Sequence, residues 1–230
     1  VMVKNPMHPD IELWAGAVER LQKAGVERER ILLAHRGFST SSRWRYRNDP
    51  MWHLVLDMKR RFGDLRMICD PSHISGNREL IGEVAQTAAN LNCDGLIIES
   101  HCNPQMALSD KEQQLRPEHL GQVLESIVWR ALDSHDNDYL ASMSQYRTEI
   151  DQIDRELFEL LSRRMRISDQ IGEIKRKNDV IILQSDRWQE IVSRVLSHAE
   201  KWQLSPKFLE AILEAIHIES IEHQNRIMKQ

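Results

Sequence analysis

Four short apolar runs in the first half of this chain restrict its fold more than any other feature. Each run begins apolar and ends polar: VMVKNP (1–6), ILLAHRGF (31–38), RMICDPSH (66–73) and GLIIESH (95–101). Helical periodicity occupies the stretches after them, near residues 10–24, 50–62, 79–91 and 117–133. Runs this short and complete, roughly 30 residues apart, are typical of βα units whose parallel sheet is covered on both faces. We therefore expect four βα units, either half of an eight-unit barrel or a small open sheet.

The second half of the chain has a different periodicity. Residues 140–177 contain no proline and a single glycine, Gly172, while apolar residues recur at helical spacing. A helix of about 36 residues would be about 54 Å long, and a helix of that length needs partners along it. Two more helices are predicted near 185–202 and 206–229, the last one opening with Ser205 and Pro206 as N-cap and first helical residue.

The polar stretch SHDNDYLAS (134–142) is the predicted linker between these halves. The expected architecture is thus an α/β barrel segment over residues 1–133, followed by an all-helical domain of three helices over residues 143–230. Because the chain opens at Val1, directly in an apolar run, we expect it to begin part-way through a longer polypeptide.

Charge and cysteine content exclude several classes of protein. The 230 residues carry a formal net charge of −4, which argues against nucleic-acid binding and against a polybasic membrane surface. No apolar run approaches the ~18 residues of a membrane-spanning helix. The odd number of cysteines, without tight pair spacing, fits free thiols in a reducing cytoplasm. They are Cys69, Cys93 and Cys102.

Polar side chains follow each of the four predicted strands. They are Lys4-Asn5, His35-Arg36, Asp70 to His73, and Glu99 to His101. The carboxyl ends of parallel strands meet at one edge of a sheet, which is where barrels place their active sites. Four such endings in register predict a functional face at that edge.

The residue types at this face indicate a metal and an anion. His73, Glu99 and Asp110 supply an imidazole and two carboxylates, which suit Mn²⁺, Fe²⁺ or Zn²⁺ better than a thiolate zinc site would. Lys4 and Arg36 add two cations suited to a phosphate or carboxylate group. Structural alternatives exist: a turn for His73, a helix N-cap for Asp110, and rim ion pairs for the two cations. Packing explains two neighbouring residues better than metal ligation does: His101 and Cys102.

Five segments, in this order, carry a resemblance: VKNP, HRGFS, ICDPSHISGNRE, GLIIESH and ALSDKEQQL. They resemble the second half of the 3-deoxy-D-arabino-heptulosonate 7-phosphate synthase family, over residues 1 to about 130. The resemblance implies half of a TIM barrel that uses a divalent metal to condense phosphoenolpyruvate with erythrose 4-phosphate. It implies that the catalytic Lys4 and Arg36 bind phosphoenolpyruvate, and that His73, Glu99 and Asp110 ligate the metal. The family's fourth ligand, a cysteine after an early strand, has no counterpart here, so synthase activity is expected only of a longer chain.

Two cations lie within the apolar stripe of the long helix. Eleven residues separate Arg164 from Lys175, which leaves about 20° of offset and a distance of about 16 Å. Few acids lie in the stripe to pair with them, so these cations predict an anionic ligand. The alternative is that their long stems snorkel from the edge of the bundle. Arg147, about 100° away in azimuth, would have to reach a different pocket, such as one in a partner.

Ser220 and Gln224 lie four residues apart on one face of the last helix, a pattern that alone could be an ordinary polar face. Together with YRTEIDQIDRELFELLSRRMRISDQIGEIK, it resembles the all-helical chorismate mutase family over about 143–228. The resemblance implies an intertwined homodimer that needs no cofactor, with Lys175 and Gln224 at the ether oxygen of chorismate. The other implied contacts are Arg164, Arg187, Ser220 and, from across the dimer, Arg147.

The chain departs from the mutase pattern where family members often carry acids that contact the substrate hydroxyl. Gln184 can still hydrogen-bond there, but Trp188 cannot accept a hydrogen bond. The leading interpretation is a bifunctional cytoplasmic enzyme of aromatic biosynthesis, whose mutase ligands could also restrain the synthase. A second interpretation is a non-catalytic mutase domain that dimerises the protein and senses chorismate or prephenate. A third is an unrelated metal-dependent, aldolase-like barrel with a structural helical tail.

Overall fold

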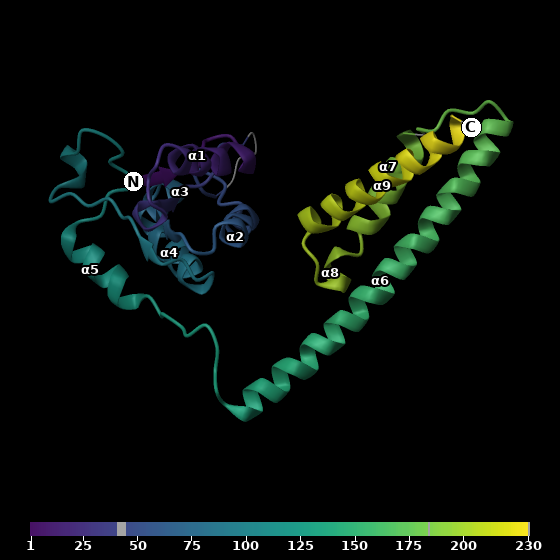
Figure 1. The fold of residues 1–230 in the computed structure, drawn as a ribbon. Helices are drawn as coiled ribbons and strands as arrows, with labels where there is room; N and C mark the ends of the chain where they lie inside the picture. The colour runs from purple at the N-terminus through teal and green to yellow at the C-terminus, as the bar shows by residue number, and fades with distance from the viewer. Residues whose placement is uncertain (41–44, 184, 230) are drawn as a thin grey trace. The chain divides into compact units, whose positions relative to one another are not determined.

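The computed structural model describes residues 1–40, 45–183 and 185–229. It divides into two compact units, Val1–Asp133 and Ser134–Gln230, shown in Figure 1. No helix in the described part of the chain is long and apolar enough to cross a membrane.

Unit 1 is built on a parallel sheet with the strand order β1-β2-β3-β4. The strands are β1 (Met2–Lys4), β2 (Leu32–His35), β3 (Arg66–Cys69) and β4 (Gly95–Leu96). Lys4 pairs with Ala34 and His35 pairs with Cys69, so the carboxyl ends of the strands lie along one edge. The four predicted strands and their parallel direction are confirmed, although β4 is much shorter than the run at 95–101.

Helices and short 3₁₀ turns connect and follow these strands. The elements are α1 (Ile11–Lys23), η1 (Arg28–Arg30), α2 (Trp52–Arg61), α3 (Pro71–Ser75), η2 (Arg78–Leu80), α4 (Ile81–Asn90), η3 (Pro104–Met106) and α5 (Pro117–Ser126). The predicted helix at 117–133 is wrong beyond Ser126. Ile127 is extended and packs against Ala85 and Ala89, and the backbone N–H of Val128 donates to the Gln86 side chain at 2.8 Å.

The core of unit 1 lies between the sheet and the helices α1, α2 and α4. Each helix contributes side chains to one buried cluster, for example Trp14 of α1, Val55 of α2 and Val84 of α4. These side chains lie in the same cluster as Leu33 and Met67 of the strands. Burial alternates in β1 and β3, where the residues between the core positions are less buried. The connecting helices cover one face of these strands, as right-handed crossovers require, and the other face is only partly covered in this chain. In a closed barrel that second face is the packed interior.

Unit 2 consists of α6 (Asn137–Lys177), α7 (Ser185–Leu196), α8 (Ala199–Trp202) and α9 (Pro206–Met228). Asp136 caps α6 by accepting a hydrogen bond from the backbone N–H of Tyr139 at 2.7 Å. Residues 137–142 are therefore helical, and the predicted linker at 134–142 is too long. The cap predicted for the last helix is confirmed, because Ser205 accepts from the N–H of Phe208 at 3.2 Å.

The predicted helix at 185–202 is interrupted between α7 and α8. The hydroxyl of Ser197 donates to the Arg194 carbonyl at 2.7 Å, and Nδ1 of His198 lies 2.8 Å from the same oxygen. Side chains that bond a helical carbonyl compete with the backbone N–H that would continue the helix. The interruption is therefore local and comes from these two polar residues.

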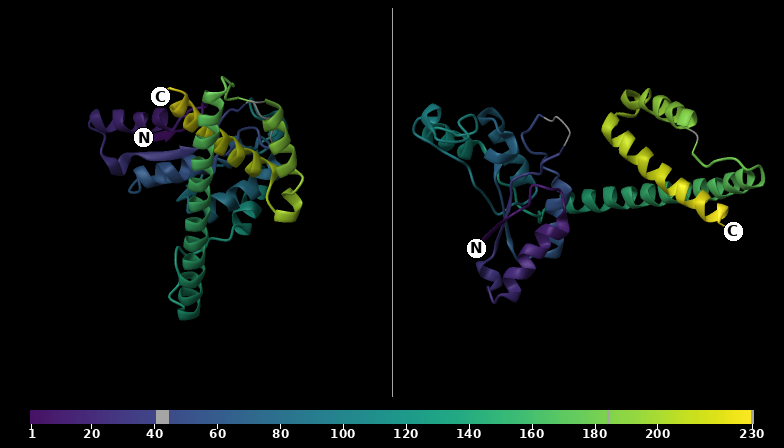
Figure 2. Two further views of the ribbon diagram at one scale, coloured as in Figure 1. Left: turned by 90° about the vertical axis from the view of Figure 1, so that its right-hand side faces the viewer. Right: turned by 90° about the horizontal axis from the view of Figure 1, so that it is seen from above.

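Helix α9 crosses the C-terminal half of α6, as the two views in Figure 2 show. Gly172 allows the close approach, because a Cβ there would lie 3.2 Å from the Cα of Gln224 and 3.3 Å from the Cβ of Ile227. The N-terminal half of α6 extends beyond α7 and α9 in every view. Its apolar stripe is exposed, with Ile153 and Leu157 at 57% and 48% exposure.

Candidate functional site

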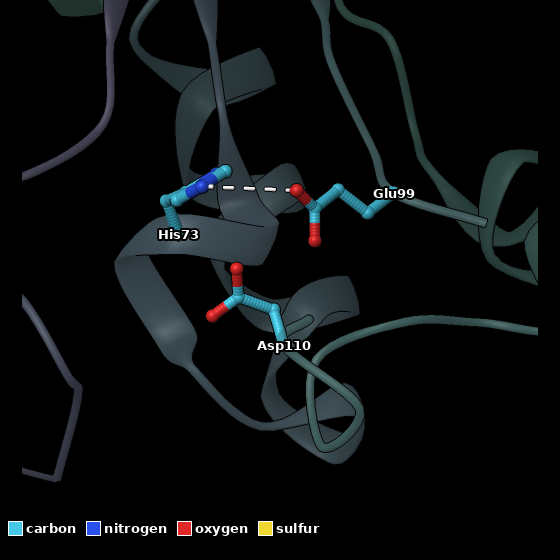
Figure 3. Close-up of side chains that lie close together, drawn as sticks. All are labelled: His73, Glu99 and Asp110. Atoms are coloured by element: carbon cyan, nitrogen blue, oxygen red, sulfur yellow. Dashed lines mark ion pairs between the residues drawn. The ribbon is translucent and has the colours of Figure 1, made fainter. Parts of the chain in front are cut away.

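Three side chains from separate segments of unit 1 converge at the carboxyl edge of the sheet (Figure 3). One ligand atom from each of His73, Glu99 and Asp110 lies within 4.8 Å of the others. Nε2 of His73 is 3.7 Å from Oε1 of Glu99. Within the described ranges this is the group of His, Cys, Asp and Glu residues whose spacing could hold a metal ion. An imidazole and two carboxylates fit a divalent metal of the Mn²⁺, Fe²⁺ or Zn²⁺ type.

His73 lies in α3 and is oriented by the N-cap residue of that helix. The carboxylate of Asp70 accepts a hydrogen bond from the backbone N–H of His73 at 3.1 Å, and its Oδ2 lies 2.8 Å from Nδ1 of the ring. Asp70 is buried, and its contact with Nδ1 leaves Nε2 directed toward Glu99. The two atoms are close but are not aligned as a hydrogen bond, so Asp70 favours this ring orientation without fixing the tautomer.

The two carboxylates are held by the segments that follow β4. The backbone N–H of Glu99 donates to the Ser72 hydroxyl at 3.0 Å, and the N–H of Leu115 donates to the Glu99 carbonyl at 3.1 Å. Asp110 has a φ of 51°, a left-handed conformation that concentrates at functional sites when it occurs outside glycine. Asp110 therefore lies in a tight turn, and the helix-cap alternative for it is wrong.

Three cations surround this cluster. Nζ of Lys4 lies 3.9 Å from Oδ2 of Asp70, so Lys4 forms an ion pair at the rim. Nε of Arg36 is buried and has no hydrogen-bond partner among the described residues. The guanidinium of Arg47 donates to Asp110 at 2.6 Å and lowers the pKa of that carboxyl, with smaller effects of His73 and Arg36 in the same direction.

The two neighbours predicted to serve in packing lie outside the cluster. Nδ1 of His101 accepts a hydrogen bond from the backbone N–H of Asn103 at 2.9 Å. Cys102 is exposed, so the packing interpretation is wrong for it. Neither residue belongs to the group that could hold a metal.

Unit 2 contains a cavity of about 470 Å³ lined by residues of α6, α7 and α9 and by Ile182 of the loop between α6 and α7. Five residues predicted from the sequence line it: Arg164, Lys175, Arg187, Ser220 and Gln224. No aspartate or glutamate is found among its described lining residues. The cavity therefore presents three cations to a ligand without an acid of its own.

Burial makes the cations of this cavity costly to leave without an anionic partner. The guanidinium of Arg164 donates to the Ser220 hydroxyl, and Nζ of Lys175 donates to the Ile182 carbonyl at 2.5 Å. Burial lowers the pKa of both Arg164 and Lys175, which shows that these cations are partly desolvated. An anionic ligand would stabilise such cations. Their contacts within the cavity argue against the alternative in which the two side chains only extend into solvent. Arg187 also pairs with Glu190 at 2.6 Å, so this cation is partly neutralised.

One predicted residue, Arg147, is not brought into the cavity, and another, Gln184, lies outside the described residues. Arg147 is exposed on the N-terminal half of α6, away from the lining residues. Trp188 does line the cavity, and its ring stacks on His217 with centroids 4.2 Å apart. Burial, together with the charge of Arg164, lowers the pKa of His217, so the imidazole is neutral at pH 7.

Sequence reasoning missed His217, Asp70 and Arg47. His217 precedes Ser220 by three residues and Gln224 by seven, and that helical spacing was the available signal. In the sequence, Asp70 is only one member of a polar strand ending. Arg47 is one of three arginines in the stretch SRWRYR, and nothing in the sequence distinguishes it from the other two.

Comparison with known proteins agrees with this division of the chain. Residues 1–134 match the model of the DAHP synthetase I family, and residues 146–225 match the model of chorismate mutase type II. The phospho-2-dehydro-3-deoxyheptonate aldolase of Thermotoga maritima is 28% identical over 115 residues, covering 50% of this chain and 33% of that protein. The T-protein of Haemophilus influenzae is 27% identical over 88 residues, covering 38% of this chain and 23% of that protein.

A crystal structure of the Thermotoga maritima aldolase, also called DAHP synthase, is similar to this chain with a TM-score of 0.50 and 28% sequence identity. The similarity covers 54% of this chain and 36% of that one. The chain thus spans a third or less of the length of the curated relatives described above, at 33% and 23%. It belongs to the DAHP synthetase I family, as a partial α/β segment of that barrel fused to a type II chorismate mutase domain.

Proposed function

We propose that unit 2 converts chorismate to prephenate. The observation that carries this proposal is a cavity with three cations and no acid among its described lining residues. Chorismate is a dicarboxylate, and guanidinium groups bind carboxylates with two parallel hydrogen bonds. Its rearrangement is intramolecular, so the site needs no nucleophile, base or cofactor. It must hold the reactive conformer and stabilise charge on the breaking ether bond.

Each polar residue of the cavity has a role in this proposal. Arg164, held by Ser220, and Arg187 bind the two carboxylates. Lys175 and Gln224 serve the ether oxygen, where a donor is worth more as the bond breaks. Lys175 is a partly desolvated cation, and the buried Oε1 of Gln224 has no partner among the described residues. That oxygen can only accept, so the donor that Gln224 would offer to the ether oxygen is its amide Nε2.

The test is Lys175→Ala, measured as prephenate formation by the whole chain. We expect turnover to fall about 100-fold or more, because removal of one such donor typically costs 10²–10³ in rate. The matched control is Lys177→Ala, which removes an exposed lysine two residues further along the same helix. Normal turnover by the Lys175 variant would refute the assignment, and equal losses in both variants would point to a general effect on α6.

For unit 1, we propose a part in the condensation of phosphoenolpyruvate with erythrose 4-phosphate, carried out by a protein that contains the rest of the barrel. His73, Glu99 and Asp110 would hold a divalent metal, Mn²⁺, Fe²⁺ or Zn²⁺. Such a metal, when bound, polarises a carbonyl oxygen as a Lewis acid. Lys4 and Arg36 would bind phosphoenolpyruvate, and the unpartnered Nε of Arg36 supports that role.

The exposed stripe on the N-terminal half of α6 supports a homodimer through the helical domain. Ile150, Ile153, Leu157 and Leu160 are each 48–62% exposed and recur at helical spacing. The same stripe on α6 of a second copy could pack against it, in either direction, and both stripes would then be buried. Arg147 lies on this same half of α6, so a dimer would carry it toward the partner's cavity.

One observation favours a second candidate function, a binding module without mutase activity. Trp188 gives the cavity an indole that cannot accept a hydrogen bond from a substrate hydroxyl. In this case the cavity would bind chorismate or prephenate without turnover, and the ligand would act on the attached synthase. Steady-state kinetics of the whole chain distinguish the two, since only the enzyme produces prephenate faster than the uncatalysed reaction.

A further inference from the structure

We infer that Gln113 is a positioning residue of the metal site, holding one oxygen of Glu99 so that the other faces the metal. The inference rests on the proposed metal-binding role of His73, Glu99 and Asp110. It concerns a buried side chain that carries no ligand atom itself. Gln113 is 1% exposed and lies in the turn after Asp110.

Gln113 connects the two carboxylate ligands through a continuous set of hydrogen bonds. Its Nε2 donates to Oε2 of Glu99 at 2.9 Å, and its Oε1 accepts from Nη1 of Arg47 at 2.9 Å. The same Nη1 donates to Oδ1 of Asp110 at 2.6 Å. The separation of Glu99 and Asp110 is therefore set by Gln113 and Arg47.

The chemistry of the partners permits a single orientation of the Gln113 amide. An amide offers a donor at its nitrogen and an acceptor at its oxygen, while a carboxylate only accepts and a guanidinium only donates. A flipped amide would place oxygen against the carboxylate of Glu99 and the NH₂ group against the guanidinium of Arg47. Both hydrogen bonds would be lost, so the network itself fixes the amide.

Among the described residues, these contacts leave one ligand atom free on each of the three metal-binding side chains. Asp70 lies against Nδ1 of His73, Gln113 bonds Oε2 of Glu99, and Arg47 bonds Oδ1 of Asp110. Nε2 of His73 and Oε1 of Glu99 remain and face each other at 3.7 Å. Outer partners of this kind change metal affinity by about 10–100-fold when they are removed.

Backbone contacts hold this network in place. The N–H groups of Arg47 and Asn48 donate to carbonyls of α3, those of Ser75 at 3.2 Å and Ile74 at 3.1 Å. Gly76 has a φ of 62°, and a Cβ there would lie 2.5 Å from the Cβ of Arg47. The backbone segment that carries Arg47 therefore packs closely against α3, which carries His73. This packing holds Arg47 within hydrogen-bond distance of Gln113.

The experiment measures Mn²⁺ binding to the whole chain by the loss of the free-ion signal in electron paramagnetic resonance. We compare wild type with Gln113→Met, which keeps length and apolar volume but removes both hydrogen bonds. Gln113→Asn is a second variant that keeps a polar amide but is one methylene too short to span both partners. Gln105→Met, an exposed glutamine in η3, is the matched control. We expect Mn²⁺ affinity to fall about tenfold or more in both Gln113 variants and to stay unchanged in the control.

A spectroscopic measurement separates positioning from a general structural effect. Infrared difference spectra of the Mn²⁺-loaded protein report the splitting of the carboxylate stretching bands, which depends on whether one or both oxygens bind. We expect Gln113→Met to change this splitting, because Oε2 of Glu99 is released. Unchanged affinity and unchanged bands in both variants would overturn the role of Gln113. If wild type binds no Mn²⁺, the metal site itself is wrong, and the role of Gln113 falls with it.

Discussion

The core of unit 1 strongly changes the pKa of His35, which lies at the carboxyl end of β2. The imidazole is fully buried, and its ring lies 5.0 Å from Trp52, 5.8 Å from Phe38 and 6.3 Å from Trp14, centroid to centroid. Burial lowers the pKa of His35 to about 3. The residue next to Arg36 is therefore a neutral aromatic ring at physiological pH, and adds no charge to the proposed anion site.

This burial predicts that unit 1 loses stability in mild acid. His35 binds a proton near pH 6.5 when unfolded and near pH 3 when folded, so the unfolded state binds more protons between those values. The free energy of unfolding should therefore fall as the pH drops below about 6.5, by up to about 1.4 kcal/mol per pH unit. Thermal unfolding between pH 7 and pH 4 measures this slope. His35→Gln removes the titrating group, and a slope equal to that of wild type would contradict the assignment.

The proposed metal ligands could be predicted from the sequence, but the residues that hydrogen-bond to them could not. His73 and Glu99 follow apolar runs, and their shared edge follows from the parallel order of the strands. Gln113 and Arg47 act through hydrogen bonds between positions 66 residues apart, and Arg47 reaches Asp110 across 63 residues. Nothing local in the sequence encodes such a pairing, because it depends on how a loop lies against α3.

At the scale of elements, α6 combines two surfaces in one helix of 41 residues. Its C-terminal half builds the cavity with α7 and α9, whereas its N-terminal half exposes an apolar stripe. Periodicity predicted the helix and the position of Arg164 and Lys175 on one face. The helix ends were harder to predict, since they depend on single side-chain contacts such as the cap at Asp136 and the Ser197 and His198 bonds to the Arg194 carbonyl.

The exposed stripe predicts that a charge within it will block dimer formation. We expect Leu157→Glu to yield monomers, because a carboxylate at the centre of the stripe would have to be desolvated in the interface. Size-exclusion chromatography with light scattering gives the mass directly. Arg155→Glu is the control, since Arg155 lies outside the stripe formed by Ile150, Ile153 and Leu157. A wild-type mass that is already monomeric, or a dimer that survives Leu157→Glu, would contradict the proposed interface.

At the scale of the whole molecule, the two units differ in how much of a site each contains. Unit 2 lines its cavity with described residues of three helices and with Ile182 of the loop between α6 and α7. Unit 1 contributes four parallel strands, three metal ligands and the cations Lys4 and Arg36 to the edge of a sheet that is not closed. A barrel interior is filled by side chains from all of its strands, so this segment alone leaves part of the site unbuilt.

We therefore expect the 230-residue chain to produce prephenate from chorismate but not to condense phosphoenolpyruvate with erythrose 4-phosphate. Both activities can be measured on one preparation with added Mn²⁺, which removes differences in folding or concentration. Lys175→Ala should lower the first activity about 100-fold or more and leave metal binding unchanged. Formation of the heptulosonate product by this chain would show that four strands are sufficient for the condensation.

The close approach of α9 to α6 at Gly172 restricts which residues related proteins can carry at this position. A side chain at position 172 would meet the backbone of Gln224 and the side chain of Ile227 before it met any ligand. Exposed positions of α6 can be exchanged independently, whereas an exchange of Gly172 requires α9 to move by a few tenths of an ångström or to change its own side chains. Positions 172, 224 and 227 should therefore covary in an alignment of homologues, even though only one of the three has a proposed role in chemistry.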